Sequence, residues 1–509
     1  MAQIRVSDLT FCYEGSYDNI FEKVSFSIDT DWKIGFVGRN GKGKTTFLNL
    51  LLGKYEYEGS ISTSTVFDYF PYKISEEDEH KTADELMDSW KPGIENWRVM
   101  CELPALGMEA DILYRPIRTL SFGERTKVML AVLFSGENDF LLIDEPTNHL
   151  DQEARTVIKK YLSSKKGFLL VSHDRDLLDA CVDHILALNR TSIEVQSGNF
   201  SSWWENKEKA DQNARAENEK HLKEIGKLKA AADQALRWAD KSEGTKIGFD
   251  PVKEHDRSIG SRSYIGAKTK KMQARVKNYE VRISREIEEK EGLLGDIEET
   301  VELKLMPLVF HKSRIIECRD FSLKYENGNE PVIRNLNLEI SVGGRYFLNG
   351  ANGCGKSSLI KAILEQSQSG NPERMGIEVT GQLSVASNLI ISYVSQDTSH
   401  LRGNLRAYAD RNHLDYTLLL SLLRQLDFDR TQFSKNMEEF SEGQKKKVLI
   451  AASLLTPAHL YVWDEPLNYI DVFSRMQIEK LIETYKPTML LVEHDAKFRE
   501  RIATHVIEM

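Results

Sequence analysis

The chain has 509 residues, of which 41% are hydrophobic and 29% charged, and its formal net charge is -10. This length exceeds what one hydrophobic core supports and predicts roughly two to four domains. No window approaches the roughly 18 apolar residues of a membrane span, and the N-terminus lacks the basic-then-apolar order of a signal peptide. The five cysteines are scattered without metal-ligand spacing, so we expect a soluble, cytoplasmic protein with reduced thiols.

The chain opens with short alternating runs such as IRVSDLTFCY, which predict strands, and continues into a glycine-rich loop. This loop, GRNGKGKT, fits the pattern G-x-x-x-x-G-K-[ST]. In that pattern the loop N–H groups face phosphate oxygens, the lysine reaches the β- and γ-phosphates, and the following hydroxyl ligates Mg²⁺. The predicted ATP ligands here are Gly38, Asn40, Gly41, Gly43, Lys44, Thr45 and Thr46, with Thr45 also on Mg²⁺.

Further along, the apolar run FLLID predicts a buried strand that delivers two adjacent carboxylates at its end. Asp144 suits the Mg²⁺ shell, and Glu145 suits the general base that activates water. Without phosphate chemistry, this strand would bury two costly unpaired charges. A later strand ends at His173, which suits contact with the γ-phosphate and orientation of the attacking water.

Residues 204–305 are predicted to form a helical linker. The segment is polar and helix-forming, with two runs of apolar residues at helical spacing. These runs are Leu222, Ile225, Leu228, Ala232, Leu236 and Ala239, then Met272, Val276, Tyr279, Ile283, Ile287, Leu294 and Ile297. Two such helices predict an antiparallel hairpin, and the glycines and proline between them predict a tip loop at about 242–263.

Residues 257–277 carry seven basic side chains and no acidic one, in an acidic chain. Charge runs usually belong to solvated helix faces, but such faces normally mix signs. Complete exclusion of carboxylates favours a phosphate-rich partner, and so a nucleic acid. The predicted contacts are Lys246, Phe249 and His255 in the tip, then Arg257, Arg262, Lys268, Lys270, Lys271, Arg275 and Lys277.

The remaining sequence repeats the first part. GRNGKGKTTFLNLLLG recurs as GANGCGKSSLIKAIL, FLLIDEPTNHLD as LYVWDEPLNYID, LSFGERTKVMLAVLF as FSEGQKKKVLIAASL, and LLVSHD as LLVEHD. One order and nearly one offset predict two homologous α/β domains, at 1–203 and 306–509. The matching ligands are Gly350, Asn352, Gly353, Gly355, Lys356, Ser357 and Ser358, with Ser357 and Asp464 on Mg²⁺ and Glu465 and His494 as the catalytic pair.

The segments SFGE and SEGQ place a serine and a glycine at the start of a helix, which forms a further anion site. They resemble the signature motif of ABC ATPases, which hydrolyse ATP to ADP and phosphate. The resemblance implies that the two domains pair head to tail within one chain. Ser441 and Gly443 would then complete the first ATP site, and Ser121 and Gly123 the second.

Two further features belong to the same resemblance. Tyr13 and Tyr325 match the ABC aromatic residue that stacks on adenine. Gln396 matches the Q-loop glutamine that binds Mg²⁺, whereas Tyr72 stands at the equivalent point of the first half. Because tyrosine lacks an amide oxygen, we expect the first site to be slower or to complete its metal shell with water.

DEPTNHLD, the paired domains and the long linker together resemble the ABC-F family, soluble ATPases that act on ribosomes. DEPLNYID in the second half departs from this motif at Leu467 and Tyr469. YIGAKTKKMQARVK resembles the Lsa/Vga-like antibiotic-resistance branch. That branch implies entry into the E site of the 70S ribosome and a linker tip that reaches toward P-site tRNA and 23S rRNA at the peptidyl transferase centre. Lincosamides, streptogramin A compounds or pleuromutilins would be displaced, and hydrolysis would release the protein.

Other functions share these motifs. A housekeeping ABC-F translation factor is the nearest alternative. An ATPase that serves a membrane transporter and a DNA-repair or chromatin ATPase are more distant ones. The chain ends soon after His494, so we expect no C-terminal extension, and this favours a compact resistance-type member.

Overall fold

The structure is a computed structural model that describes residues 3–13, 19–39, 41, 43–137, 139–148, 150–189, 193–244, 277, 282–283, 304–326, 330–351, 353–369 and 377–509. The chain divides into two compact units. One consists of Met1–Trp203 with Val301–Met509, and the other of Trp204–Thr300. The first unit contains both halves of the duplication.

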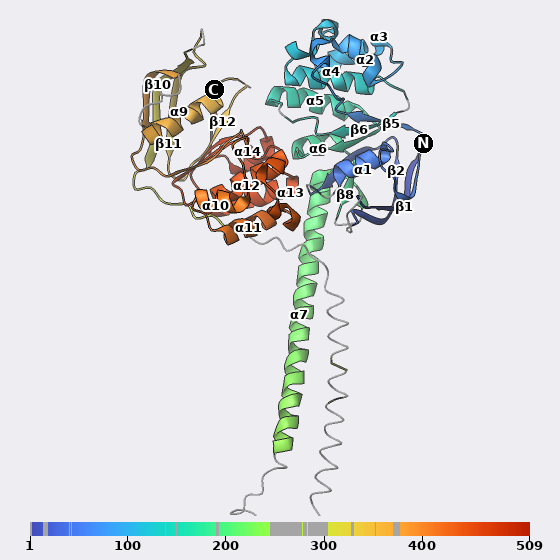
Figure 1. Cartoon of the computed structure of the whole chain (residues 1–509), viewed down its shortest axis with the longest axis vertical. Coiled ribbons are helices and arrows are strands. Elements are labelled where there is room, and N and C mark those ends of the chain that lie inside the picture. The colour runs from blue at the N-terminus through green and yellow to red at the C-terminus, as the bar shows by residue number, and fades with distance from the viewer. Residues whose placement is uncertain are drawn as a thin grey trace, which may run out of the picture. The chain divides into compact units, whose positions relative to one another are not determined.

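The first half alternates strands and helices, as its apolar runs predict (Figure 1). Short 3₁₀ turns lie at Asp78–His80, Leu103–Leu106, Ala110–Tyr114 and Ile117–Thr119. The elements are β1 (Gln3–Phe11), β2 (Phe21–Asp29), β3 (Lys33–Gly38), α1 (Lys44–Leu51), β4 (Glu58–Ser62), β5 (Val66–Phe70), α2 (Ala83–Trp90), α3 (Asn96–Glu102), α4 (Phe122–Phe134), β6 (Asp139–Asp144), α5 (Gln152–Ser164), β7 (Phe168–Val171), α6 (Arg175–Cys181), β8 (His184–Leu188) and β9 (Ile193–Ser197).

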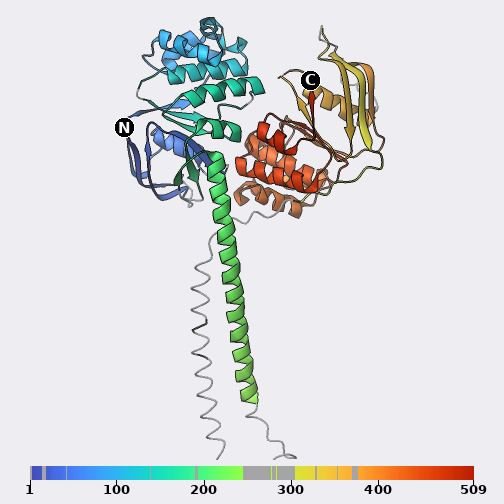
Figure 2. The same ribbon diagram turned by 180° about the vertical axis from the view of Figure 1, so that it is seen from behind.

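Its main sheet has the order β5-β6-β7-β3-β8-β9, in which β9 alone runs antiparallel to its neighbour. A smaller antiparallel sheet has the order β2-β1-β4. Helix α1 lies between the two sheets (Figures 1 and 2), because Phe47 packs in one core cluster with Val6 of β1 and Leu142 of β6. This packing fixes the start of α1, and with it the phosphate-binding loop.

The second half repeats this arrangement. Its elements are β10 (Arg314–Tyr325), β11 (Ile333–Ser341), β12 (Arg345–Asn349), α9 (Lys356–Ser369), β13 (Ile377–Val385), β14 (Ile391–Val394), α10 (Leu405–Arg411), α11 (Tyr416–Gln425), α12 (Glu442–Leu455), β15 (Leu460–Asp464), α13 (Val472–Tyr485), β16 (Met489–Val492), α14 (Ala496–Ile502) and β17 (His505–Glu508), with 3₁₀ turns at Arg430–Ser434 and Met437–Glu439.

In the parallel sheet of this half, β14-β15-β16-β12-β17, the central strands β15 and β16 are buried on both faces. Alternate residues of β15 point to different cores. Leu460 and Val462 pack with β10, β11 and α9, whereas Tyr461 and Trp463 pack with α10, α11 and α12. A strand covered on both faces needs a continuous apolar run, which explains LYVW and FLLI.

In each half, three neighbouring parallel strands end at one edge of the sheet. The phosphate loop follows β3 or β12, the Asp-Glu pair closes β6 or β15, and the histidine follows β7 or β16. Since ligands of open α/β sheets bind outside the carboxyl ends of the strands, this edge is where the predicted chemistry can gather.

The two halves contact each other through a buried ion pair. Arg175 of α6 donates through Nη1 to Glu479 Oε2 of α13 at 3.1 Å, and Arg501 donates to the same carboxylate at 3.2 Å. Glu479 has no exposed surface, and Arg175 is 4% exposed. Such a pair depends on both partners, because either charge alone would be costly to bury.

The linker begins with α7 (Phe200–Gly244), a helix of 45 residues that spans about 68 Å at 1.5 Å per residue. It continues past Ala239 and includes positions 242–244, where the sequence predicts the start of the tip loop; the prediction is wrong for these three positions. The sequence ADKSE contains no helix breaker before Gly244, which explains the extension. The rest of the predicted tip and most of the second helix lie outside the described residues. Among those described, no helix is apolar over a long enough stretch to cross a membrane.

Candidate ATP sites

The phosphate loop of the second half leads from β12 into α9. Lys356 Nζ donates to the carbonyl oxygens of Gly350 at 2.8 Å and Ala351 at 2.9 Å. Gly355 has φ 103°, and a Cβ there would lie 2.8 Å from Ile333 Cγ1. Glycine is therefore required by both backbone conformation and space. The loop wraps around the lysine ammonium, as a phosphate-binding loop must.

The first half has the same geometry. Lys44 Nζ donates to the carbonyl oxygens of Gly38 at 2.5 Å and Arg39 at 3.3 Å. Thr45 is exposed at the start of α1, and Gly41 lies on the loop with φ 78°. The predicted ligands Asn40 and Asn352 lie outside the described residues.

The candidate bases follow the strand ends in a strained conformation. Glu145 has φ 50° and Glu465 φ 47°, in the left-handed region that costs non-glycine residues energy. Each is held by a backbone bond to the neighbouring strand, from Glu145 N to Val171 O at 2.9 Å and from Glu465 N to Val492 O at 3.0 Å. This backbone conformation directs each carboxylate toward the candidate ATP site of its own half.

Each candidate base lies beside the predicted histidine. His173 Nε2 is 3.4 Å from Glu145 Oε1, and His494 Nε2 is 3.7 Å from Glu465 Oε1. Burial lowers the pKa of His173 well below its usual value, and the Lys44 charge lowers it further. A neutral imidazole at this place can accept or relay a proton.

The two carboxylates have opposite pKa shifts. Burial, then the Asp144 charge, raises the pKa of Glu145 to about 8. Burial also acts to raise the pKa of Glu465, but the close contact with His494 and the hydrogen bond from Gln396 outweigh it, and the pKa falls below its usual value. The second site thus holds an ionised base in the neutral pH range, whereas the first site holds a protonated one.

The predicted metal ligands fit a hard cation. The Ser357 hydroxyl hydrogen-bonds Asp464, and burial raises the pKa of that carboxyl. Asp464 is 1% exposed, and its Oδ1 atom has no hydrogen-bond partner within the described residues. In the first half, Asp144 accepts a bond from the Tyr69 hydroxyl at 3.1 Å. Hydroxyl and carboxylate oxygens are the donors that Mg²⁺ prefers.

The position of Tyr72 is equivalent to that of Gln396, as strand register shows. Tyr69 lies opposite Leu142, and Tyr393 lies opposite Val462, at equivalent places in the repeat. The two side chains differ in their contacts, however.

Gln396 Nε2 donates to Glu465 Oε2 at 2.9 Å. The Tyr72 hydroxyl instead donates to Asp68 at 2.9 Å, and its ring stacks on Trp90 with an interplanar angle of 6°. Tyr72 therefore belongs to a side-chain cluster beside the site. In the first half, it is the Tyr69 hydroxyl that contacts a site carboxylate.

The two signature serines cap helices. Ser121 accepts from Glu124 N at the start of α4, and Ser441 accepts from Gln444 N at the start of α12, each in a reciprocal capping box. A Cβ on Gly443 would lie 2.5 Å from the Tyr469 carbonyl oxygen, so this glycine permits close backbone contact.

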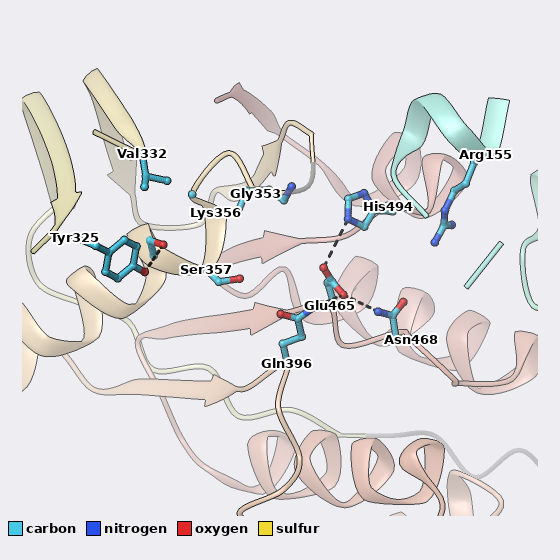
Figure 3. Close-up of a pocket in the computed structure, with 12 residues that line it drawn as sticks. Arg155, Tyr325, Val332, Gly353, Lys356, Ser357, Gln396, Glu465, Asn468 and His494 are labelled. Atoms are coloured by element: carbon cyan, nitrogen blue, oxygen red, sulfur yellow. Dashed lines mark hydrogen bonds and ion pairs between the residues drawn. The ribbon is translucent and has the colours of Figure 1, made fainter. Parts of the chain in front are cut away.

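A cavity of about 460 Å³ lies at the second site (Figure 3). Ser121 and Gly123 are not among the described residues that line it. The lining is Arg155, Tyr325, Val332, Gly353, Gly355, Lys356, Ser357, Ser358, Gln396, Glu465, Asn468 and His494.

The candidate adenine-binding tyrosines are anchored near the loops. The Tyr325 hydroxyl lies 2.7 Å from Ser358 Oγ, and the Tyr13 hydroxyl lies 2.7 Å from Thr46 Oγ1. Tyr325 lines the cavity, and Tyr13 is 41% exposed. Both rings stand beside the phosphate loop of their own half.

The sequence interpretation missed three site residues. Asn468 Nδ2 donates to Glu465 Oε2 at 2.7 Å, and Lys446 Nζ donates to the Ser395 carbonyl at 2.8 Å. Arg155 lines the second-half cavity although it belongs to the first half. Asn468 and Arg155 could have been found from the sequence, because the other half has the same residue type at the equivalent position.

Of the predicted RNA contacts, Lys277 is described and is exposed. The other nine predicted contacts (Lys246, Phe249, His255, Arg257, Arg262, Lys268, Lys270, Lys271 and Arg275) lie outside the described residues.

Comparison with known families agrees with this geometry. The profile of the family described as "ABC transporter" matches residues 21–148 and 333–468, more than half of the chain. The chain therefore belongs to this family, and it folds as two tandem ABC ATPase domains of mixed α/β structure.

Relatives match over nearly the whole chain. "Ribosome protection protein VmlR" of Bacillus subtilis (strain 168) is 26% identical over 502 residues, covering 96% of this chain and 84% of that protein. "Energy-dependent translational throttle protein EttA" of Haemophilus influenzae is 25% identical over 541 residues, covering 96% and 89%.

The fold also resembles solved structures. The structure titled "Crystal structure of the complex of archaeal ribosomal stalk protein aP1 and archaeal ribosome recycling factor aABCE1." has a TM-score of 0.58 and 18% identity, and covers 98% of this chain and 87% of that one. This similarity concerns the fold alone.

Proposed function

We propose that the protein is an ABC-F ATPase that hydrolyses ATP with Mg²⁺ at two sites. The observation that carries this proposal is the convergence of Lys356, Ser357, Gln396, Glu465 and His494 around one cavity. The equivalent residues Lys44, Thr45, Glu145 and His173 recur in the first half. Bound Mg²⁺ would neutralise charge on the β- and γ-phosphates.

The residues have distinct roles in this proposal. Lys44 and Lys356 bind the phosphates. Glu145 and Glu465 accept the proton of the attacking water, and His173 and His494 orient that water. The hydrogen bonds of Glu465 with Gln396 and Asn468 hold its carboxylate in place at the second site.

We further propose that the ATP-bound protein protects ribosomes in the cytoplasm. It would enter the E site, extend its linker tip toward P-site tRNA and the peptidyl transferase centre, and dislodge lincosamide, streptogramin A or pleuromutilin drugs. Three points support this proposal: the relative named for ribosome protection, the reach of α7, and the carboxylate-free basic run at 257–277.

A housekeeping role in translation remains the second candidate. It is favoured by the EttA relative, which matches a similar share of the chain at nearly the same identity. The two functions differ in outcome, since resistance requires that drug-inhibited ribosomes resume synthesis.

Ribosome association is tested by co-sedimentation. A Glu145→Gln/Glu465→Gln chain should sediment with 70S ribosomes when ATP is present, because it binds ATP without hydrolysing it. A Lys44→Ala/Lys356→Ala chain is the matched control and should stay in the supernatant. Binding without ATP, or no binding by the trapped chain, would contradict the proposal, and partition of the chain with membranes would favour a transporter role.

Resistance is tested in a susceptible bacterial host. Expression of the wild-type chain should raise the inhibitory concentration of at least one of the three drug classes. The Glu145→Gln/Glu465→Gln chain should not, because it cannot leave the ribosome. An unchanged inhibitory concentration, together with ATP-dependent ribosome binding, would favour the housekeeping function.

A further inference from the structure

Two arginines that lie outside the predicted motifs occupy equivalent places in the two halves. Arg155 follows Asp151, which caps the N-terminus of α5, and Arg475 follows Asp471, which caps α13. Both arginines sit in the first turn and a half of their helices. The repeat therefore places one guanidinium at the same point of each domain.

Arg155 is held in its own half but lines the cavity of the other. Its Nε donates to the Leu150 carbonyl at 3.0 Å, and its Nη1 lies 3.4 Å from the Asp174 carboxylate. The same side chain lines the cavity that contains Lys356 and Glu465 (Figure 3). The side chain is 15% exposed, so its charge is largely withdrawn from water.

Arg475 repeats these bonds in the second half. Its Nε donates to the Ile470 carbonyl at 2.9 Å, and its Nη1 lies 3.3 Å from Asp495. Each arginine is thus bound within its own half. Arg155 also lines the cavity of the other half, and the repeat gives Arg475 the equivalent position relative to the first site.

This arrangement suits recognition of a phosphate. A guanidinium is planar, permanently charged and able to form parallel bonds to phosphate oxygens. The hydrogen bonds of each arginine engage its Nε and Nη1 atoms and fix the plane of the guanidinium in advance. A pre-positioned cation of this kind stabilises charge that develops on a transferred phosphoryl group.

We propose that Arg155 and Arg475 bind the terminal phosphate of ATP in trans, Arg155 at the second site and Arg475 at the first. The inference rests on the proposed function, since it requires ATP at both sites. Hydrolysis removes the group that each arginine contacts, so these residues distinguish ATP from ADP. They also make each site dependent on the other half of the chain.

The test isolates one site at a time. Lys44→Ala removes binding at the first site and leaves the second, and Lys356→Ala does the reverse. In the Lys44→Ala chain, Arg155→Gln should weaken binding of a non-hydrolysable ATP analogue about tenfold, equivalent to about 1.4 kcal/mol. ADP binding should change by less than about twofold, and Arg475→Gln should have little effect. In the Lys356→Ala chain, Arg475→Gln should weaken binding of the ATP analogue, and Arg155→Gln should have little effect. Titration calorimetry with Mg²⁺ measures all of these affinities.

Controls separate binding from folding. Arg319→Gln changes an exposed arginine of β10 that pairs with Glu317, and it should leave both affinities unchanged. Arg155→Lys and Arg475→Lys keep the charge without the planar fork and should give intermediate losses. Thermal unfolding shows whether each glutamine variant folds. If one does not, the lysine variants replace it in the binding measurements.

Two results would overturn the inference. One is a cis pattern, in which Arg155→Gln weakens the first site and Arg475→Gln the second. The other is an equal loss of ATP-analogue and ADP affinity, which indicates a purely structural role. If the wild-type chain binds neither nucleotide, the proposed function itself fails, and this outcome is distinct from both.

Discussion

At the scale of single residues, the two candidate ATP sites differ around their candidate bases. Glu465 accepts hydrogen bonds from Gln396 and Asn468 at 2.9 and 2.7 Å. Glu145 has a buried Oε1 atom that accepts no hydrogen bond within the described residues. One substitution in the repeat, Tyr72 for glutamine, removes a donor from the first site. Burial and the Asp144 charge raise the pKa of Glu145, whereas at Glu465 the contacts with His494 and Gln396 outweigh burial.

The first prediction concerns pH. An acid with a raised pKa is protonated below that pKa, so Glu145 becomes a base only as pH rises through about 8. In a Glu465→Gln chain, which retains the first site, kcat/KM for ATP should rise between about pH 7 and pH 9. A Glu145→Gln chain, which retains the second site, should show a flat profile there. Steady-state ATPase assays measure both, and matching profiles or equal single-turnover rates would contradict the asymmetry.

The second prediction compares Gln396 with Tyr72. In the Glu145→Gln chain, Gln396→Ala removes a hydrogen bond to the base and should lower kcat about tenfold or more. Tyr72→Phe is the matched control in the Glu465→Gln chain. It should leave kcat unchanged and lower the free energy of unfolding by about 1 kcal/mol, because its hydroxyl bonds Asp68. A large loss of turnover in Tyr72→Phe would show that the hydroxyl acts in the reaction.

At the scale of elements, the helix starts carry the predicted chemistry. Helices α1 and α9 begin at the phosphate-binding lysines, and α4 and α12 begin at capped serines. An N-terminus offers unpaired N–H groups and a partial positive charge, which suits both capping and anion binding. Ser441 accepts the Gln444 N–H as a helix cap in the structure, whereas its contact with nucleotide is a prediction from the resemblance.

The third prediction separates these two roles of Ser441. Aspartate caps helices as well as serine does, but it repels phosphate. Ser441→Ala should lower the free energy of unfolding by about 1 kcal/mol, whereas Ser441→Asp should preserve it. Both should lower turnover of the first site, measured in the Glu465→Gln chain, and Ser441→Asp should lower it more. Full activity in the aspartate variant would leave capping as the role of this serine.

At the scale of the whole molecule, the ATPase unit depends on contacts between its halves. The Arg175–Glu479 pair joins α6 to α13, and Trp203 contacts the Phe473 ring with centroids 6.2 Å apart. Lys497 also pairs with Asp179. These contacts join segments roughly 300 residues apart in the sequence, so the halves fold into one unit.

The fourth prediction tests this connection. Glu479→Ala leaves the buried Arg175 charge without its partner and should lower the free energy of unfolding by about 3–5 kcal/mol. Glu483→Ala is the control, because that residue also pairs with Arg501 but is 39% exposed, and it should cost less than about 1 kcal/mol. Denaturant unfolding measures both. Similar small losses would show that the pair contributes little to stability.

The sequence by itself determined the duplication, the α/β class and the phosphate loops. These features can be read from short segments. The phosphate-loop motif spans eight consecutive residues, and a buried parallel strand requires one continuous apolar run. The sequence also predicted that Glu145 lies near His173 and Glu465 near His494, because the two residues of each pair follow neighbouring strands of one sheet. The length of α7 was underestimated by a few residues, because polar helix formers give no sharp end.

Only the tertiary structure decided where side chains from distant segments meet. It directed Tyr72 toward Asp68, placed the Tyr69 hydroxyl on Asp144, and brought Arg155 into the cavity of the other half. Such contacts depend on strand register, side-chain direction and the fit between two domains, none of which is encoded in a short motif. The sequence therefore specifies which residues each candidate ATP site can contain, and the tertiary structure specifies which of these side chains meet and how the two candidate sites differ.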